Sequence, residues 1–225
     1  RDQPRSRGLG DVYKRQGLGT TWEILNMDMK PYPCCRSAHA GIDGALSLRK
    51  AILGEGMLPL ADAEQRILDS VVSLEAETYK IGYQQCAVSD GCLHPQNPLD
   101  AKFSLPFTLA GALVLGQVDQ SLFTPEKVAD PAIQTMLGRI RVREAADLTA
   151  AYPGHWSCRV KVQLKDGRVL GQFIQDPTGS YRKPLSEEAA LQKAEGLLAN
   201  VYPHQAAQVA RKLLNLPEAE KLPEV

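Results

Sequence analysis

The stretch Trp156-Ser-Cys-Arg-Val-Lys-Val-Gln-Leu-Lys-Asp-Gly-Arg-Val-Leu-Gly-Gln-Phe-Ile174 decides the fold class of this chain. Apolar and polar side chains alternate over residues 156–164, which is the pattern of a strand with one buried face. Asp166-Gly167 then marks a tight turn, and a second strand is expected over residues 169–174. The stretch therefore predicts a β-hairpin.

Further strand and helix patterns flank the hairpin. Alternation over residues 68–76 predicts a half-buried strand, and Ile140 and Val142 between arginines predict another. Helices are expected at residues 37–53, 104–115 and 131–137. A long loop punctuated by Gly, Pro and Asn is expected at residues 84–101. Strands mixed with helices predict an α+β domain with a small antiparallel sheet and packed helices, ending near residue 184.

The two ends of the chain differ from this domain, which we place at residues 17–184. Residues 1–16 carry five basic residues among Pro and Gly without apolar periodicity, so we expect a non-native or disordered leader. Ser186 is a candidate N-cap for helices within residues 185–225. Their apolar stripes predict docking on a largely missing all-helical domain, and the chain would then be part of a longer protein.

Composition excludes several classes of protein. Lys plus Arg (26) equals Asp plus Glu (26), so the chain has no overall charge to attract nucleic acid or an acidic membrane. The longest apolar run, at residues 107–116, is too short to span a bilayer. Five cysteines, two of them adjacent, favour a reducing, cytoplasmic location. The spacing of Cys86, Cys92 and His94 is not that of a zinc site, so we expect no metal.

The segment Lys30-Pro-Tyr-Pro-Cys-Cys-Arg-Ser-Ala-His-Ala-Gly-Ile-Asp43 is the candidate site. Ser37 is a plausible helix N-cap, and Lys30 and Arg36 add positive charge beside the amides of the first turn, which predicts an anion-binding corner. His39 and Asp43 share a helical face, so the carboxylate could orient the imidazole for proton transfer. The residues alone leave open the alternative that His39 packs under a loop while Asp43 is solvated.

Four stretches, in order, resemble the MmgE/PrpD family, which includes 2-methylcitrate dehydratases and cis-aconitate decarboxylases. They are Lys30-x-x-Pro33 with His39 and Asp43, Ala101-Lys-Phe-Ser-Leu-Pro-Phe107, Val162-Gln-Leu-Lys-Asp-Gly167 and Arg182-Lys-Pro-Leu-Ser186-Glu. The resemblance covers residues 17–214 and concerns the C-terminal portion of the family only. It implies a small α/β lid domain, followed by helices that return to a helical domain built mainly from the other half of the protein.

The resemblance also implies a function. Family members are lyases that need no cofactor and remove a proton next to a carboxylate of a small di- or tricarboxylic acid, such as 2-methylcitrate. The implied enzyme is a homodimer when complete, and the chain alone is expected to be inactive. Alternatives on the same scaffold are a decarboxylase, an epimerase or an isomerase, and a different alternative is a non-catalytic binding or dimerisation module.

By motif position, the resemblance implies that His39 is catalytic and is oriented by Asp43. It implies substrate contacts for Lys30, Arg36, Lys102 and Phe107. Phe107 falls where many family members carry a tyrosine, so a hydroxyl contact would be lost here. For Phe107 a core position is an equal alternative, and for Lys102 the alternative is a solvated residue near a helix start.

Overall fold

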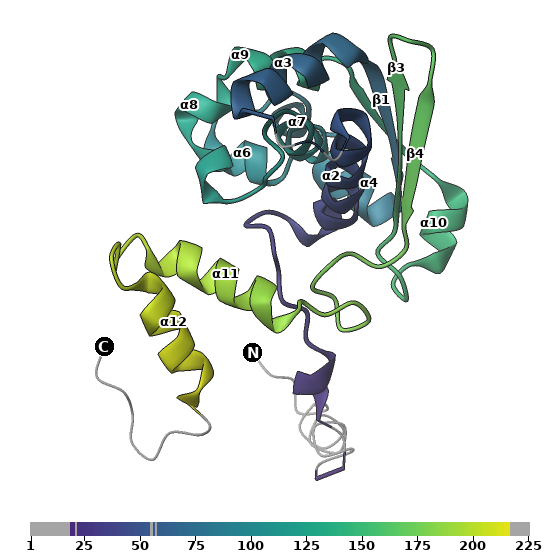
Figure 1. Cartoon of the computed structure of the whole chain (residues 1–225). Coiled ribbons are helices and arrows are strands. Elements are labelled where there is room, and N and C mark those ends of the chain that lie inside the picture. The colour runs from purple at the N-terminus through teal and green to yellow at the C-terminus, as the bar shows by residue number, and fades with distance from the viewer. Residues whose placement is uncertain (1–18, 21, 55, 57, 217–225) are drawn as a thin grey trace.

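The computed structural model describes residues 19–20, 22–54, 56 and 58–216. The predicted leader at residues 1–16 lies outside this part of the chain. The described residues form a sheet covered on one face by a layer of helices, and a separate pair of helices follows (Figure 1). This arrangement confirms the α+β class.

The described residues contain one four-stranded sheet in the order β2-β1-β3-β4. Its strands are β1 (Val71–Thr78), β2 (Ile140–Glu144), β3 (Cys158–Leu164) and β4 (Val169–Ile174). β1 pairs antiparallel with β3, and β3 with β4, but β1 and β2 are parallel. The expectation of a purely antiparallel sheet was therefore wrong for one pair, because several helices connect β1 to β2 and allow the chain to return in the same direction.

The predicted hairpin is confirmed. β3 presents alternate residues to the core, and Val160, Val162 and Leu164 are buried. Gly167 has a φ of +88° in the connecting turn, a conformation that glycine adopts without steric cost. The alternating pattern fixed both the strands and their buried face, because side chains of a strand point to opposite sides with a period of two.

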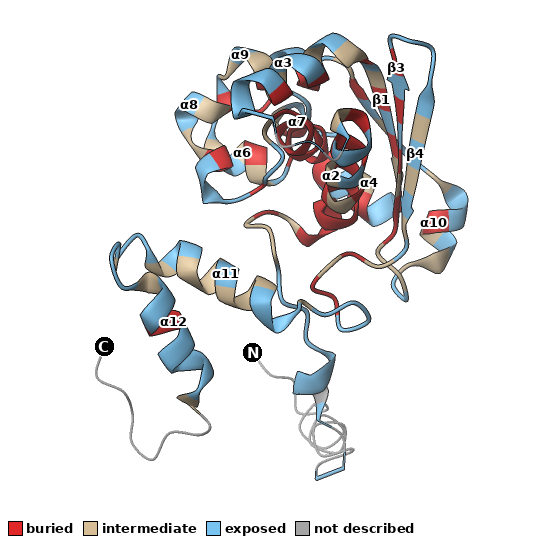
Figure 2. Cartoon of the chain, viewed as in Figure 1, coloured by how far each residue is buried: buried red, intermediate tan, exposed pale blue. Residues whose placement is uncertain are grey.

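Four helices make the layer that covers the sheet. They are α2 (His39–Leu53), α3 (Leu60–Ser70), α7 (Leu105–Leu115) and α9 (Pro131–Leu137). α7 is buried along almost its whole length, as predicted from its uniformly apolar sequence (Figure 2). α2 packs against β3 and β4, and a Cβ added at Gly44 would lie 2.5 Å from Val160 Cγ2. The close contact between this helix and the sheet therefore depends on a glycine.

Two expectations from the sequence were wrong in this layer. The strand predicted from residue 68 begins only at Val71, because α3 extends to Ser70. The predicted loop at residues 84–101 includes short helices, of which two begin at the side-chain caps Ser89 and Asn97. The helices in this region are α4 (Lys80–Cys86), α5 (Asp90–Leu93) and α6 (Pro98–Lys102). The remaining short elements are η1 (Glu23–Asn26), η2 (Arg36–Ala38), η3 (Gln120–Phe123), α8 (Pro125–Val128) and α10 (Ala146–Ala151).

The last described helices are α11 (Glu187–Leu198) and α12 (Ala206–Leu214), which pack against each other. Ser186 caps α11 as predicted, since its hydroxyl accepts from the Ala189 amide at 3.2 Å. α11 has no buried residue, and in Figure 2 the pair lies apart from the buried core of the other elements. The division proposed near residue 184 stays a prediction. No helix of the described residues is long and apolar enough to cross a membrane.

Candidate functional site

The chain that leads into α2 is tied to the loop that follows β4. The Met29 amide donates to the Gly179 carbonyl at 2.7 Å, and Arg36 Nη1 donates to the Thr178 carbonyl at 3.1 Å. Gly179 has a φ of +79°, and a Cβ at this position would collide with the Met29 carbonyl oxygen. A glycine is therefore required where the two segments touch, and it helps to hold the candidate site in place.

The start of the helix differs from the prediction. α2 begins at His39 after the 3₁₀ turn η2, and its N-cap is Ala38, which has no side-chain cap. Ser37 lies inside the turn, where its hydroxyl donates to Gln85 Oε1 at 3.0 Å and accepts from the Tyr79 hydroxyl at 2.9 Å. Ser37 therefore links the turn to α4 instead of capping α2, because two tertiary partners hold its hydroxyl.

Three of the predicted substrate-contact residues line one cleft of about 460 Å³, here called the cationic cleft. Lys30 and Arg36 come from the segment before α2, and Lys102 comes from the end of α6. No Asp or Glu is among the residues that line the cleft, whereas Cys35 and Trp156 are. The fold thus gathers positive charge from two distant parts of the sequence around one opening.

The three cations are held differently. Arg36 forms an ion pair with Asp28, with 2.9 Å between Arg36 Nη2 and Asp28 Oδ2. Lys30 Nζ donates to the Cys34 carbonyl at 3.2 Å, and Lys102 Nζ lies 5.8 Å from the centroid of the Phe123 ring. Among the described residues, neither lysine forms an ion pair. The two lysines are therefore the uncompensated charges of the cleft.

His39 lies behind the cleft rather than in it. The side chain is fully buried, with 0% exposure, and its Nδ1 is 3.0 Å from Arg36 Nη1. Because a guanidinium only donates, Nδ1 accepts and the proton of the neutral ring is on Nε2, which has no hydrogen-bond partner among the described residues. Burial, followed by the charge of Arg36, lowers the pKa of His39 to about 3. In this arrangement His39 is a neutral acceptor that orients Arg36.

Asp43 does not touch His39, contrary to the helical-face argument. Its carboxylate accepts from the Tyr32 hydroxyl at 2.6 Å and from the Thr178 amide at 2.7 Å. Burial, together with the neighbouring Asp43 carboxylate, raises the pKa of Tyr32 well above its usual range. The Tyr32 ring in turn meets the edge of the His39 ring, with 5.1 Å between their centroids. Asp43 is therefore connected to His39 through the Tyr32 side chain.

Phe107 takes the core position that the sequence analysis left as an alternative. It is fully buried in α7, with its ring centroid 6.4 Å from that of Phe123, and it is not among the residues that line the cationic cleft. A direct substrate contact by Phe107 is not supported, because a molecule in the cationic cleft cannot reach a side chain without exposed surface.

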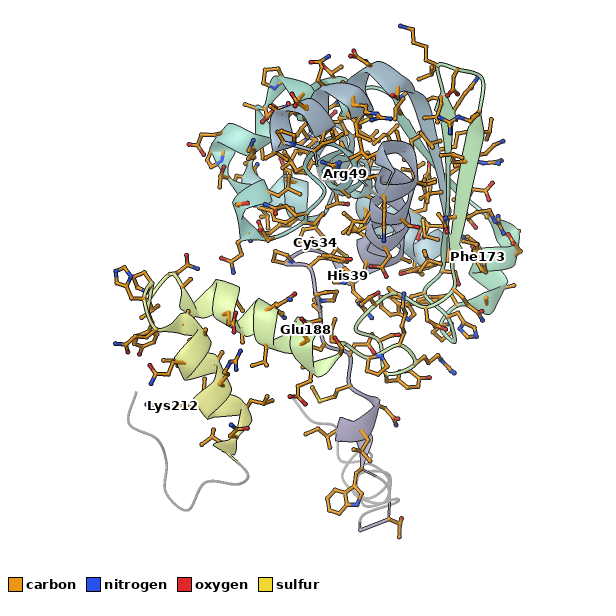
Figure 3. All side chains as sticks on the ribbon, viewed as in Figure 1. Cys34, His39, Arg49, Phe173, Glu188 and Lys212 are labelled. Carbon is orange, nitrogen blue, oxygen red and sulfur yellow. The ribbon has the colours of Figure 1, made fainter. Side chains whose placement is uncertain are left out.

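A second cleft, of about 780 Å³, lies between the segment before α2 and α11. Lys30 and Tyr32 line one side and Lys193 lines the other, and Lys193 Nζ donates to the Lys30 carbonyl at 2.6 Å. Figure 3 shows Cys34 and His39 at the end of the globular part that faces α11. Lys30 therefore lies on the boundary of both clefts.

Sequence reasoning missed Asp28, Tyr32, Cys35 and Trp156, which contact or line this site. Local periodicity could not find them, since their partners are not neighbours on one helix. Among the described residues, no group of three or more His, Cys, Asp or Glu side chains is placed to hold a metal ion.

Comparison with known proteins identifies the family. The model of the MmgE/PrpD C-terminal domain matches residues 32–216, which is most of the chain. The chain belongs to the MmgE/PrpD family. It is 22% identical over 170 residues to the cis-aconitate decarboxylase of Mus musculus, a match that covers 74% of this chain and 32% of that protein. The Homo sapiens cis-aconitate decarboxylase is also 22% identical, with 75% of this chain and 32% of that protein covered. The chain thus spans about a third of the length of these relatives.

Proposed function

We propose that this chain supplies the carboxylate-binding part of a lyase that acts on a small di- or tricarboxylic acid without a cofactor. The observation that carries the proposal is the cationic cleft, where Lys30, Arg36 and Lys102 meet without an acidic side chain. A substrate with two or more carboxylates would satisfy the unpaired lysines, while Arg36 stays paired with Asp28. The chain covers 32% of its curated relatives, so we propose that the active enzyme is longer. From the resemblance to the family we further propose that it works as a homodimer.

The proposed chemistry begins with removal of a proton from the carbon next to a carboxylate. That carboxylate must then accept further negative charge, and fixed cations stabilise such charge best where water is scarce. A hydro-lyase would next expel hydroxide as water, as in dehydration of 2-methylcitrate. A decarboxylase would need no such proton removal: the carbon–carbon bond breaks, carbon dioxide leaves, and the electron pair left on carbon takes up one proton. Because two relatives are named cis-aconitate decarboxylase, decarboxylation is the alternative that we keep beside dehydration.

His39 has a positioning role in this proposal. Its neutral Nδ1 accepts from Arg36 and, together with Asp28 and the Thr178 carbonyl, fixes the guanidinium beside the cleft. In the complete enzyme, His39→Ala is expected to raise KM about tenfold with a smaller change in kcat, and His39→Asn, whose amide oxygen can replace Nδ1, is expected to restore most of KM. A hundredfold loss of kcat that His39→Asn does not restore would instead indicate direct proton transfer by His39.

Binding can be tested on the 225-residue chain itself. The two tryptophans are Trp22, which is 62% exposed, and Trp156, which lines the cationic cleft. In a Trp22→Phe background, the fluorescence of Trp156 reports occupation of the cleft. We expect cis-aconitate and citrate to change this fluorescence saturably, and acetate at the same concentration to leave it unchanged.

Matched lysine variants locate the bound acid. Lys30→Met and Lys102→Met are each expected to weaken binding about tenfold, which corresponds to roughly 1.4 kcal/mol for one charge-assisted contact. Lys161→Met, on an exposed position of β3, is the control and should leave affinity unchanged. Equal affinity in all three variants, or no fluorescence change with any acid, would contradict the proposal. In the complete enzyme, carbon dioxide release and ultraviolet absorbance of a new double bond distinguish decarboxylation from dehydration.

A further inference from the structure

Cys35 differs from the other cysteines in its access to solvent. Of the five free thiols, Cys35 alone is partly exposed, and the other four are buried. It lines the cationic cleft beside Lys30 and Arg36, and its amide donates to the Lys102 carbonyl at 2.9 Å. Cys34 also lines the cleft but is buried, so a small molecule that enters the cleft meets Cys35 as the more accessible thiol, beside two cationic side chains.

Cys86 lies directly behind Cys35. Cys86 ends α4, which packs against the η2 turn that follows Cys35. The turn is fixed to this helix by the 3.0 Å hydrogen bond from Ser37 Oγ to Gln85 Oε1. The two thiols lie close enough for each to shift the pKa of the other. Cys86 itself is fully buried, so reagents in solution reach it only through Cys35.

The closeness of the two thiols shifts their pKa values in opposite directions. The neighbouring Cys86 thiol is the largest of the influences that lower the pKa of Cys35 to about 6, and Ser37 and Lys30 add to it against the effect of burial. The neighbouring Cys35 thiol, with burial, raises the pKa of Cys86 far above its usual range. Adjacent Cys34 behaves differently, since burial raises its pKa to about 12. Only Cys35 therefore combines thiolate character with access from the cleft.

We propose that Cys35 is a site of oxidative modification by small hydroperoxides, with Cys86 as the resolving thiol. The Cys35 thiolate attacks one oxygen of hydrogen peroxide, the O–O bond breaks, and the leaving hydroxide takes up a proton to become water. Cys35 is now a sulfenic acid. Cys86 gives up its proton and attacks the Cys35 sulfur, the S–O bond breaks, and the departing hydroxide takes that proton as water. Two thiols and one peroxide yield one disulfide and two waters, and none of these steps depends on the proposed lyase activity.

The test uses the reduced 225-residue chain and hydrogen peroxide, with N-ethylmaleimide added to block remaining thiols before peptide mapping. The expected product is a Cys35–Cys86 disulfide. Cys86→Ser should stop at a Cys35 sulfenic acid that dimedone traps, and Cys35→Ser should give neither product. Cys34→Ser, the adjacent buried control, should still form the disulfide. Crosslinks that instead involve Cys34 or Cys92, or uniform oxidation of all five cysteines, would overturn the proposal.

A measurement on the unaltered chain avoids any effect of the substitutions on folding. The rate of iodoacetamide labelling at Cys35 should rise from pH 5 to 7, with a midpoint near 6, and then level off. At pH 6 it should exceed that of an ordinary free thiol about tenfold, because the larger thiolate fraction outweighs the lower intrinsic nucleophilicity. A rate at Cys35 that continues to rise to pH 9 would contradict the proposal.

Discussion

The α2–α7 region and the α11–α12 pair are both helical but have opposite surroundings. α7 buries almost every residue between α2, α9 and the sheet, whereas α11 has no buried residue. Both begin at a serine N-cap, of which the sequence predicted Ser186. The difference teaches that capping and periodicity specify a helix, while its contribution to stability depends on what the rest of the fold packs against it.

The largest expected effect compares one leucine from each region. Leu109 in α7 has 0% exposure, and Leu197 in α11 has 44%. Leu109→Ala should lower the free energy of unfolding by about 2 to 5 kcal/mol, because it leaves a cavity in a packed core. Leu197→Ala should change it by less than about 0.5 kcal/mol. Urea unfolding followed by circular dichroism measures both, and equal losses would show that α11 is packed as tightly as α7.

A second contrast concerns histidine burial. Folding lowers the pKa of His39 to about 3, below the ordinary value near 6.5. Between these two pH values the unfolded chain therefore binds more protons than the folded chain. The free energy of unfolding then falls as the pH falls. From pH 7 to pH 5 this histidine should cost about 2 kcal/mol of stability. His39→Gln should remove that part of the pH dependence. His204→Gln, at an exposed position before α12, is the matched control. Identical pH dependence in all three chains would contradict the burial of a neutral His39.

The two serine caps provide a smaller contrast. Ser104 is fully buried; its hydroxyl accepts from the Phe107 amide at 3.0 Å and also donates to the Cys92 carbonyl. Ser186 is exposed and makes only the cap bond to the Ala189 amide among the described residues. Ser104→Ala should cost about 2 kcal/mol and Ser186→Ala about 0.5 kcal/mol or less, since water can replace only the exposed cap. Thermal unfolding of both variants measures the difference, and a larger loss for Ser186→Ala would reverse the comparison.

The smallest expected effect is at the polar contact between the regions. Lys193 Nζ in α11 donates to the Lys30 carbonyl beside the cationic cleft. Lys193→Met should change the free energy of unfolding by less than about 0.5 kcal/mol, because the contact is exposed. It should nevertheless speed hydrogen exchange in α11 relative to α7. Unchanged exchange in α11 would show that this contact does not hold the helix.

Much of the fold could be read from local sequence. The hairpin was predicted from apolar residues that alternate with polar ones. α7 was predicted from its continuous apolar sequence, and α9 from the proline at its start. The parallel pairing of β2 with β1 could not be read, because the direction of a strand depends on the path of the connecting chain. The short helices at residues 84–101 were missed, because each has too few residues to show a helical period.

The sequence by itself determined the helices α7, α9 and α11, the hairpin, the family and the presence of cations around residues 30–43. Only the tertiary structure decided which of them act together: Lys102 joins Lys30 in one cleft, Asp43 binds Thr178 across 135 residues instead of His39, and Cys86 lies behind Cys35. The physical reason is the distance along the sequence over which each signal acts. Helical and strand periods report which residues share a face of one element, whereas the partner of a buried polar group is whichever satisfies its hydrogen bonds when distant elements pack.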